Sequence, residues 1–255
     1  MSRIGDAFAA ARAEGRTALI CYAMGGDGDT AALLRAIDQA GADVIELGIP
    51  FSDPIADGPV LQAAATRALA AGATLRKLFE LVGSLKLRAP IVAMGYMNPI
   101  ESIGLPAFAQ AAAQAGIAGA IVPDLPLEEA GPLRELLSAR GLELVPLVAP
   151  TTGTARAAAI AKSARGFLYT VSVTGVTGAR AVLPDDLAAR LKELRAISPV
   201  PVAVGFGIST PDQAKALKGL ADGVVVGTAL VAAHHAGGAV EAAKLVSALR
   251  AALVK

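Results

Sequence analysis

Two carboxylates lie in a stretch that starts as a strand and continues as a loop, and they are well suited to acid–base chemistry. Glu46 lies within the apolar run 43–47, and Asp57 lies in the loop 48–59, which contains three prolines. A carboxylate within an apolar strand is costly to bury unless another group pairs with it. Glu46 is therefore either a structurally paired core carboxylate, or a general acid or base at the mouth of a pocket, with Asp57 above it.

Three glycine-bearing turns could hold an anion. They span residues 175–178, 205–209 and 227–229, and each follows an apolar run. Glycine lets backbone N–H groups approach an anion closely, and the start of a helix adds a favourable dipole. Each turn alone could need glycine for its conformation only. Together they predict a site for a small phosphate ester.

Other kinds of catalytic chemistry are disfavoured by what the sequence lacks. No lysine stands at the end of a predicted strand, which disfavours a Schiff base. His234 and His235 are adjacent, so they cannot share a helix face as a pair of metal ligands would. Cys21 lies in an apolar run with no histidine placed to activate it. We therefore expect no bound metal and no thiol nucleophile, which leaves acid–base chemistry.

Tyrosines and apolar residues near the predicted strand ends could form the walls of a pocket. Tyr169 ends one apolar run and Tyr96 follows another, so each is either wall packing or a source of a hydroxyl group. The others could form a flat apolar slot for an aromatic substrate, although most of them would be core residues in an ordinary fold. These residues are Tyr22, Leu61, Met94, Ile121 and Phe206.

Short apolar runs alternate with helical segments along the chain, the pattern of repeated strand–helix units. The predicted strands are 17–23, 43–47, 91–95, 119–122, 143–148, 166–171, 201–205 and 223–226. The predicted helices are 2–14, 30–40, 61–71, 75–85, 105–115, 127–139, 154–162, 184–196, 210–217 and 236–253. The pattern predicts an α/β fold, a single (β/α)8 TIM barrel with an extra N-terminal helix and one domain over residues 1–255. A doubly wound open sheet is the alternative.

Charge and hydropathy limit the partners and the location. Lys and Arg number 23 against 22 Asp and Glu, so no broad field would attract nucleic acid or an anionic membrane. No segment has the pattern of a membrane span, and the N-terminal stretch 1–15 lacks the long apolar core of a secretory signal. We therefore expect a cytoplasmic protein.

Several motifs closely resemble those of the tryptophan synthase alpha subunit family. They are residues 46–54 with 56–59, Ser172 with 175–178, and 205–208, and they stand in the family's order. The likeness extends over about residues 18–233. It implies a barrel that cleaves indole-3-glycerol phosphate to indole and glyceraldehyde 3-phosphate, without a cofactor of its own. It also implies a beta subunit that carries pyridoxal phosphate and consumes the indole, in an alpha2beta2 complex.

The resemblance also implies roles for individual residues. Glu46 is similar to the family's acid–base glutamate, Asp57 to its second catalytic carboxylate and Tyr169 to its active-site tyrosine. A retro-aldol reaction needs an electron sink, and an indole protonated at C3 is itself such a sink, so carboxylates suffice. The positions that match the phosphate site are Gly178, Gly207, Gly227 and Thr228.

Two other functions are compatible with parts of the pattern. A different phosphate-ester isomerase or lyase would keep the glycine turns, but it would not need Asp57 or an aromatic slot. A non-catalytic subunit that binds a ligand and a partner would keep the loops, but it would tolerate the loss of Glu46, which is present.

Overall fold

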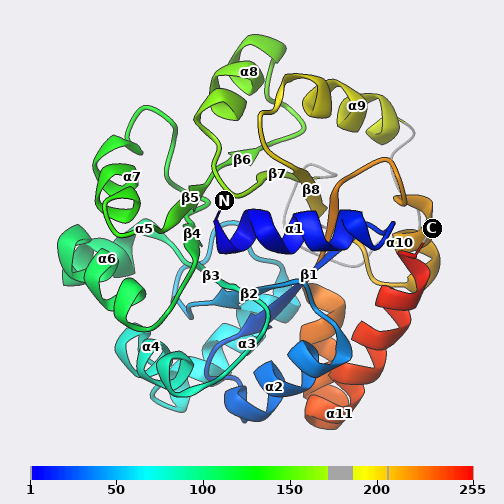
Figure 1. Cartoon of the computed structure of the whole chain (residues 1–255). Coiled ribbons are helices and arrows are strands. Elements are labelled where there is room, and N and C mark those ends of the chain that lie inside the picture. The colour runs from blue at the N-terminus through cyan, green and yellow to red at the C-terminus, as the bar shows by residue number, and fades with distance from the viewer. Residues whose placement is uncertain (1, 172–185, 206, 255) are drawn as a thin grey trace.

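The computed structural model describes residues 2–171, 186–205 and 207–254. Its parallel strands form one nine-stranded sheet in the order β5-β4-β3-β2-β1-β9-β8-β7-β6, rolled into a nearly closed barrel with helices around it (Figure 1). This confirms the predicted barrel over the open sheet. The strands are β1 (Ala18–Met24), β2 (Val44–Gly48), β3 (Ile91–Met94), β4 (Gly119–Ile121), β5 (Glu143–Val145), β6 (Leu147–Val148), β7 (Leu168–Val171), β8 (Val202–Gly205) and β9 (Gly223–Val226).

The predicted strand 143–148 is two strands, because Pro146 interrupts it. Proline has no N–H to donate to a neighbouring strand. β5 pairs with β4, β6 pairs with β7, and the Pro146 carbonyl accepts from the Tyr169 N–H at 3.1 Å. The two ends of the hydrogen-bonded sheet are therefore joined through the chain at this proline.

The helices follow the prediction with some corrections. The segment 97–103 forms a helix that was not predicted, helix 127–139 begins only at Gly131, and the last helix begins at Thr228 rather than 236 and is kinked at Gly237 and Gly238. None of the helices in the described ranges is long and apolar enough to cross a membrane. The helices are α1 (Arg3–Ala13), α2 (Thr30–Ala40), α3 (Pro59–Ala70), α4 (Leu75–Ser84), α5 (Met97–Ile103), α6 (Leu105–Gln114), α7 (Gly131–Ser138), α8 (Thr154–Ser163), α9 (Leu187–Ile197), α10 (Pro211–Ala216) and α11 (Thr228–Ala252).

Helix α1 lies across the end of the barrel where the strands begin (Figure 1). Ile4 and Phe8 are buried with the side chains of the barrel interior, and the Phe8 and Phe167 rings are 5.5 Å apart. Ser2 caps the helix by accepting from the Gly5 N–H, and its hydroxyl donates to Glu143 at 2.8 Å. The predicted N-terminal helix therefore closes this end of the barrel.

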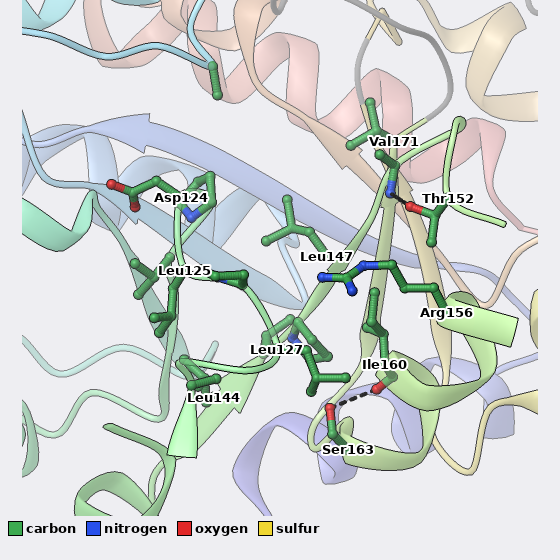
Figure 2. A pocket seen from close by; sticks show the side chains of 18 of the residues that line it. Asp124, Leu125, Leu127, Leu144, Leu147, Thr152, Arg156, Ile160, Ser163 and Val171 are labelled. Atoms are coloured by element: carbon green, nitrogen blue, oxygen red, sulfur yellow. Dashed lines mark hydrogen bonds between the residues drawn. The ribbon is translucent and has the colours of Figure 1, made fainter. Parts of the chain in front are cut away.

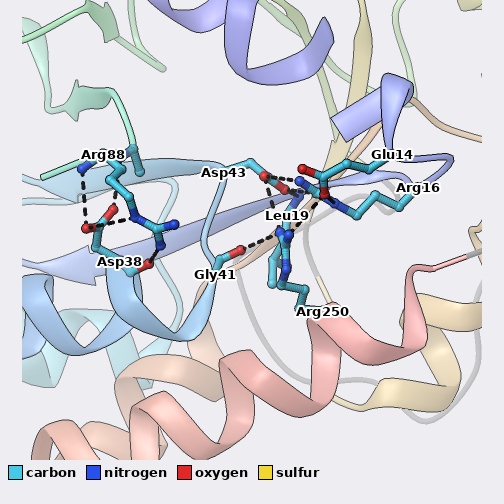
Figure 3. A network of polar contacts seen from close by, with 9 residues as sticks. Glu14, Arg16, Leu19, Asp38, Gly41, Asp43, Arg88 and Arg250 are labelled. Atoms are coloured by element: carbon cyan, nitrogen blue, oxygen red, sulfur yellow. Dashed lines mark hydrogen bonds and ion pairs between the residues drawn. The ribbon is translucent and has the colours of Figure 1, made fainter. Parts of the chain in front are cut away.

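A network of charged groups joins the start of β2 to the C-terminal helix (Figure 3). Asp43 accepts from Arg16, from Arg250 and from the Leu19 N–H, the last at 2.8 Å. Glu14 pairs with the same two arginines. The side chains of Arg16 and Asp43 are 5% and 9% exposed, so this pair is shielded from water. Removing one member of such a pair leaves an uncompensated buried charge.

Asp43→Asn is expected to lower the free energy of unfolding by about 2–3 kcal/mol. The loss should stay below that of a complete break, because the amide still accepts a hydrogen bond and Glu14 still faces Arg16. Urea unfolding measures the change, with Glu80→Gln on the exposed face of α4 as a charge-matched control. Equal stability of the two variants would contradict a stabilising role for the network.

Candidate functional site

The Glu46 side chain lies in the interior of the barrel, between neighbouring parallel strands. On β2 it pairs in register with Tyr22 of β1 and Val92 of β3. The residue is 1% exposed, and its Oε2 has no hydrogen-bond partner among the described residues. Burial, and next the nearby Asp57 carboxylate, raise the pKa of Glu46 to about 8. Glu46 can therefore carry a proton at neutral pH and release it near that pH.

Asp57 is held by its own loop and by Tyr96. It is 4% exposed, its N–H donates to the Pro54 carbonyl at 3.1 Å, and its own carbonyl accepts from the Gln62 side chain at 2.8 Å. Burial raises the pKa of Asp57 to about 6, while a hydrogen bond from Tyr96 opposes the rise. Its Oδ1 has no partner among the described residues. Asp57 is thus mostly ionised at neutral pH, with one oxygen free to accept.

Tyr96 serves two groups of the same loop. Its hydroxyl oxygen accepts from the Ala56 N–H at 3.1 Å, and the same hydroxyl donates to the Asp57 carboxylate. The ring packs against Phe51, with the two ring centroids 5.5 Å apart. Burial, followed by the Asp57 charge, raises the pKa of Tyr96, so this hydroxyl stays a donor. Tyr96 therefore fixes the loop and the Asp57 carboxylate to the end of β3.

Tyr96→Phe is expected to shift the acid side of the pH–rate profile to higher pH. In the native protein the hydrogen bond from Tyr96 lowers the pKa of Asp57. Phenylalanine cannot make this bond, so the pKa of Asp57 should rise above about 6. Turnover should then fall severalfold at pH 6.5 and much less at pH 8. The pH–rate profile measured from pH 5.5 to 9 tests this. An unchanged acid limb in Tyr96→Phe would show that the pKa of Asp57 does not depend on the Tyr96 hydroxyl.

Two other tyrosines lie beside the carboxylates. Tyr22 and Tyr169 are 5% and 3% exposed, and burial, followed by neighbouring carboxylate charge, raises the pKa of both hydroxyls. Their hydroxyls occupy the space where a side chain on Gly48 or Gly205 would otherwise stand. Glycine at these two strand ends is therefore needed for close packing of the tyrosines, a reason that the sequence alone did not reveal.

Several residues of the predicted apolar slot lie close together, and their role in binding stays a prediction. Leu61, Met94 and Ile121 are buried in one cluster with Tyr22 and Tyr169, inside the barrel. Met94 also lines a cavity of about 730 Å³ that extends from Ala56, next to Asp57. The cavity thus reaches the loop of Asp57 at Ala56, although neither carboxylate lines it. Phe206 lies outside the described residues.

Two of the three glycine turns, those after β8 and β9, lie at the same end of the barrel as Glu46. β8 pairs with β9 and β9 with β1, so their carboxyl ends are adjacent. Gly207 follows β8 with φ +88°, a conformation that favours glycine. Gly227 caps α11 and Thr228 is the first residue of that helix, whose leading N–H groups lack intrahelical partners. Gly178 and the loop 172–183 lie outside the described residues.

One pair at this end was not anticipated. Asp27, in the loop after β1, accepts two hydrogen bonds of 2.7 Å from Arg67 of α3. Asp27 is 6% exposed. The pair ties the first loop to the helix that follows Asp57. Neither residue stands in a motif, so the sequence offered no signal for their contact. In the described part of the chain, no cluster of side chains has the composition of a metal site.

Comparisons with known proteins agree with this geometry. The family model described as Tryptophan synthase alpha chain matches residues 8–252. The alpha chain of Geobacter sp. (strain M21) is 50% identical over 236 residues, covering 91% of this chain and 88% of the relative. That of Prochlorococcus marinus (strain MIT 9313) is 52% identical over 234 residues, covering 89% and 85%.

Solved structures give the same result. A tryptophan synthase structure from Mycobacterium tuberculosis superposes with a TM-score of 0.92 at 36% identity, covering 100% of this chain and 99% of that one. The alpha subunit from Legionella pneumophila superposes with a TM-score of 0.90 at 37% identity, covering 99% and 98%. The chain belongs to the tryptophan synthase alpha chain family, the lyases of tryptophan biosynthesis that cleave indole-3-glycerol phosphate.

Proposed function

We propose that Glu46 and Asp57 carry out the cleavage of indole-3-glycerol phosphate by acid–base chemistry alone. The observation that supports this is a pair of buried carboxylates, each with one oxygen that has no partner among the described residues. A buried acceptor without a partner costs stability, so its retention at a strand end favours a ligand that supplies the partner.

The pKa values divide the work between the two carboxylates. Glu46, with a pKa of about 8, is mainly protonated at pH 7 and donates its proton to C3 of the indole ring. Asp57, with a pKa of about 6, is mainly ionised, accepts from the ring N–H and stabilises the positive charge that develops there.

The carbon–carbon bond then breaks. Its electron pair returns to the ring and neutralises the positive charge, which yields indole. The ionised Glu46 takes the proton from the adjacent hydroxyl, which becomes the aldehyde of glyceraldehyde 3-phosphate. The Glu46 proton is thereby restored, so the cycle consumes no outside acid or base. Tyr169 packs beside Glu46 and helps to hold the ring in place.

The phosphate is assigned to the turns after β8 and β9. Gly207, Gly227 and Thr228 would bind it through backbone N–H groups and the Thr228 hydroxyl, at the start of α11. Gly178 would be the fourth residue that binds the phosphate. The site needs no basic side chain, since a helix N-terminus favours a bound anion by itself.

Gly227→Val should raise KM by about tenfold or more with a smaller effect on kcat. Space near Gly227 is not closed, because a Cβ would lie 3.5 Å from Tyr22, so the variant should fold and instead crowd the phosphate. Glycerol 3-phosphate should raise the Tm of the native protein but not of the variant. Gly153→Val, at the N-cap of α8 with open space around it, is the matched control. Equal protection of both variants would place the phosphate elsewhere.

The partner and the setting complete the proposal. We infer that the chain works in an alpha2beta2 complex in the cytoplasm, that it needs no cofactor of its own, and that the beta partner carries pyridoxal phosphate. A beta subunit docked over the loop of Asp57 would favour a closed site, so the chain alone should be slow and the complex fast. Indole release from indole-3-glycerol phosphate, measured with and without the partner, tests both. No release in either case would contradict the proposed mechanism, and equal rates would contradict the coupling.

A further inference from the structure

The cavity of about 730 Å³ extends well beyond the catalytic carboxylates. It begins at Ala56 and Met94 and continues outward between helices α7 and α8, over the break at Pro146. Its volume lies within the range of sites that enclose small organic molecules. The catalytic mechanism uses only the end next to Asp57, so the outer part has no assigned role.

The walls of the outer part are mainly apolar. Figure 2 shows Leu125 and Leu144 on one side and Ile160 of α8 on the other, with Leu127 and Leu147 between them. A space with such walls favours the flat apolar body of an aromatic ligand.

A single ion pair links the two sides of the opening. Arg156 of α8 donates two hydrogen bonds to Glu128, in the turn before α7, at 2.7 and 2.9 Å. Their side chains are 51% and 59% exposed. Exposed pairs contribute little to stability, so this one can open to admit a ligand.

Arg134 supplies a positive charge that is not already used. It lies on α7, lines the cavity and is half-buried, and its guanidinium has no hydrogen bond or ion pair among the described residues. Arg156 is paired with Glu128, whereas the Asp124 carboxylate accepts from the Met97 N–H with both oxygens, at 3.0 and 3.1 Å. A guanidinium without a paired counter-charge favours a carboxylate, which its planar donors match.

We propose that the outer cavity binds a small aromatic carboxylate, with the ring among the leucines and the carboxylate on Arg134. The occupant reaches toward Ala56, whose N–H is bound to Tyr96 and whose neighbour is Asp57. Its binding therefore hinders indole formation. The hindrance of indole formation rests on the proposed roles of Asp57 and Tyr96, whereas the binding of the carboxylate does not.

Two probes of the same shape test the binding. 2-Naphthoate carries the carboxylate and 2-naphthalenemethanol is its neutral counterpart, and calorimetry gives the affinity of each for the whole chain. The native protein should prefer the acid by about tenfold, and Arg134→Gln should lose most of that preference. Arg76→Gln, an exposed arginine on α4, should retain it. An unchanged preference in Arg134→Gln, or no saturable binding of 2-naphthoate, would overturn the proposal.

A cavity-filling pair of variants tests the location. Ala130→Leu places bulk in the cavity at the start of α7, whereas Ala139→Leu adds the same bulk on the exposed end of that helix. Only Ala130→Leu should weaken 2-naphthoate binding, by tenfold or more. If the Tm of Ala130→Leu falls, Ile160→Phe is the alternative variant that fills the cavity. Equal binding by the filled variants and Ala139→Leu would overturn the location. Turnover without any probe tests the proposed mechanism separately, and 2-naphthoate should lower that turnover in the native protein but much less in Arg134→Gln.

Discussion

Glu46→Gln should lower indole release by at least about 10²–10⁴-fold, because glutamine keeps the shape of the side chain but cannot exchange a proton. Binding of glycerol 3-phosphate should survive, since the phosphate turns lie on other strands. The protein should also keep its Tm. With a pKa of about 8, Glu46 is already mainly neutral at pH 7, and its Oε2 has no partner among the described residues to lose.

The stability of this variant separates the two interpretations of Glu46. A structural ion pair would lose several kcal/mol, about 3–5, when one charge is removed. Single-turnover indole release and thermal unfolding on the same sample give both quantities. Glu143→Gln is a suitable control, because burial raises the pKa of this carboxylate too, while Glu143 is only partly buried and lies at the α1 end of the barrel. Full activity with a lowered Tm in Glu46→Gln would return Glu46 to a structural role.

Asp57→Asn should lower kcat by about 10²-fold or more while changing substrate binding much less. The charge on the indole nitrogen develops mainly in the transition state, so a carboxylate there acts chiefly on the rate. The native pH–rate profile should fall below about pH 6, as Asp57 becomes protonated, and above about pH 8, as Glu46 loses its proton. The Asn variant should lose the acid limb and keep the alkaline one.

The control for Asp57 lies in the same loop. Asp53 is exposed, and among the described residues its side chain accepts from Ser52 alone, so Asp53→Asn in the isolated chain should leave kcat and both limbs unchanged. An equal loss of kcat and of affinity for a neutral indole analogue in Asp57→Asn would instead indicate that Asp57 only packs against the ring.

The sequence predicted elements well where local chemistry determines them. The bounds of α2 match the prediction, because Asp29 caps its start and Gly41 ends it in the left-handed conformation. Helix α5 was missed, since it begins directly after a strand end and its first N–H is held by Asp124 from another loop. The break at Pro146 could have been predicted from its missing N–H, whereas the prediction treated 143–148 as one apolar run.

The candidate site divides in the same way. Glu46 stood out because a carboxylate is rare in an apolar strand, and Asp57 because it is a second carboxylate in the loop that follows; both are buried in the structure. The Tyr96 contact with Asp57 depends on how two loops meet, and the Asp27–Arg67 pair likewise joins segments far apart in sequence. Such contacts have no local pattern. The need for glycine at 48 and 205 becomes clear only when the tyrosine rings are in place.

The helix across the start of the strands has a consequence for where the product goes. Ile4 and Phe8 fill that end of the barrel, so in the proposed mechanism indole formed beside Glu46 leaves on the side of the strand carboxyl ends. Indole is neutral and apolar, so its transfer into water is unfavourable. Moving directly from one apolar surface to another avoids that cost. The product therefore leaves through the end of the barrel where the strands finish. A protein that covers this end would receive the indole before it reaches the solvent.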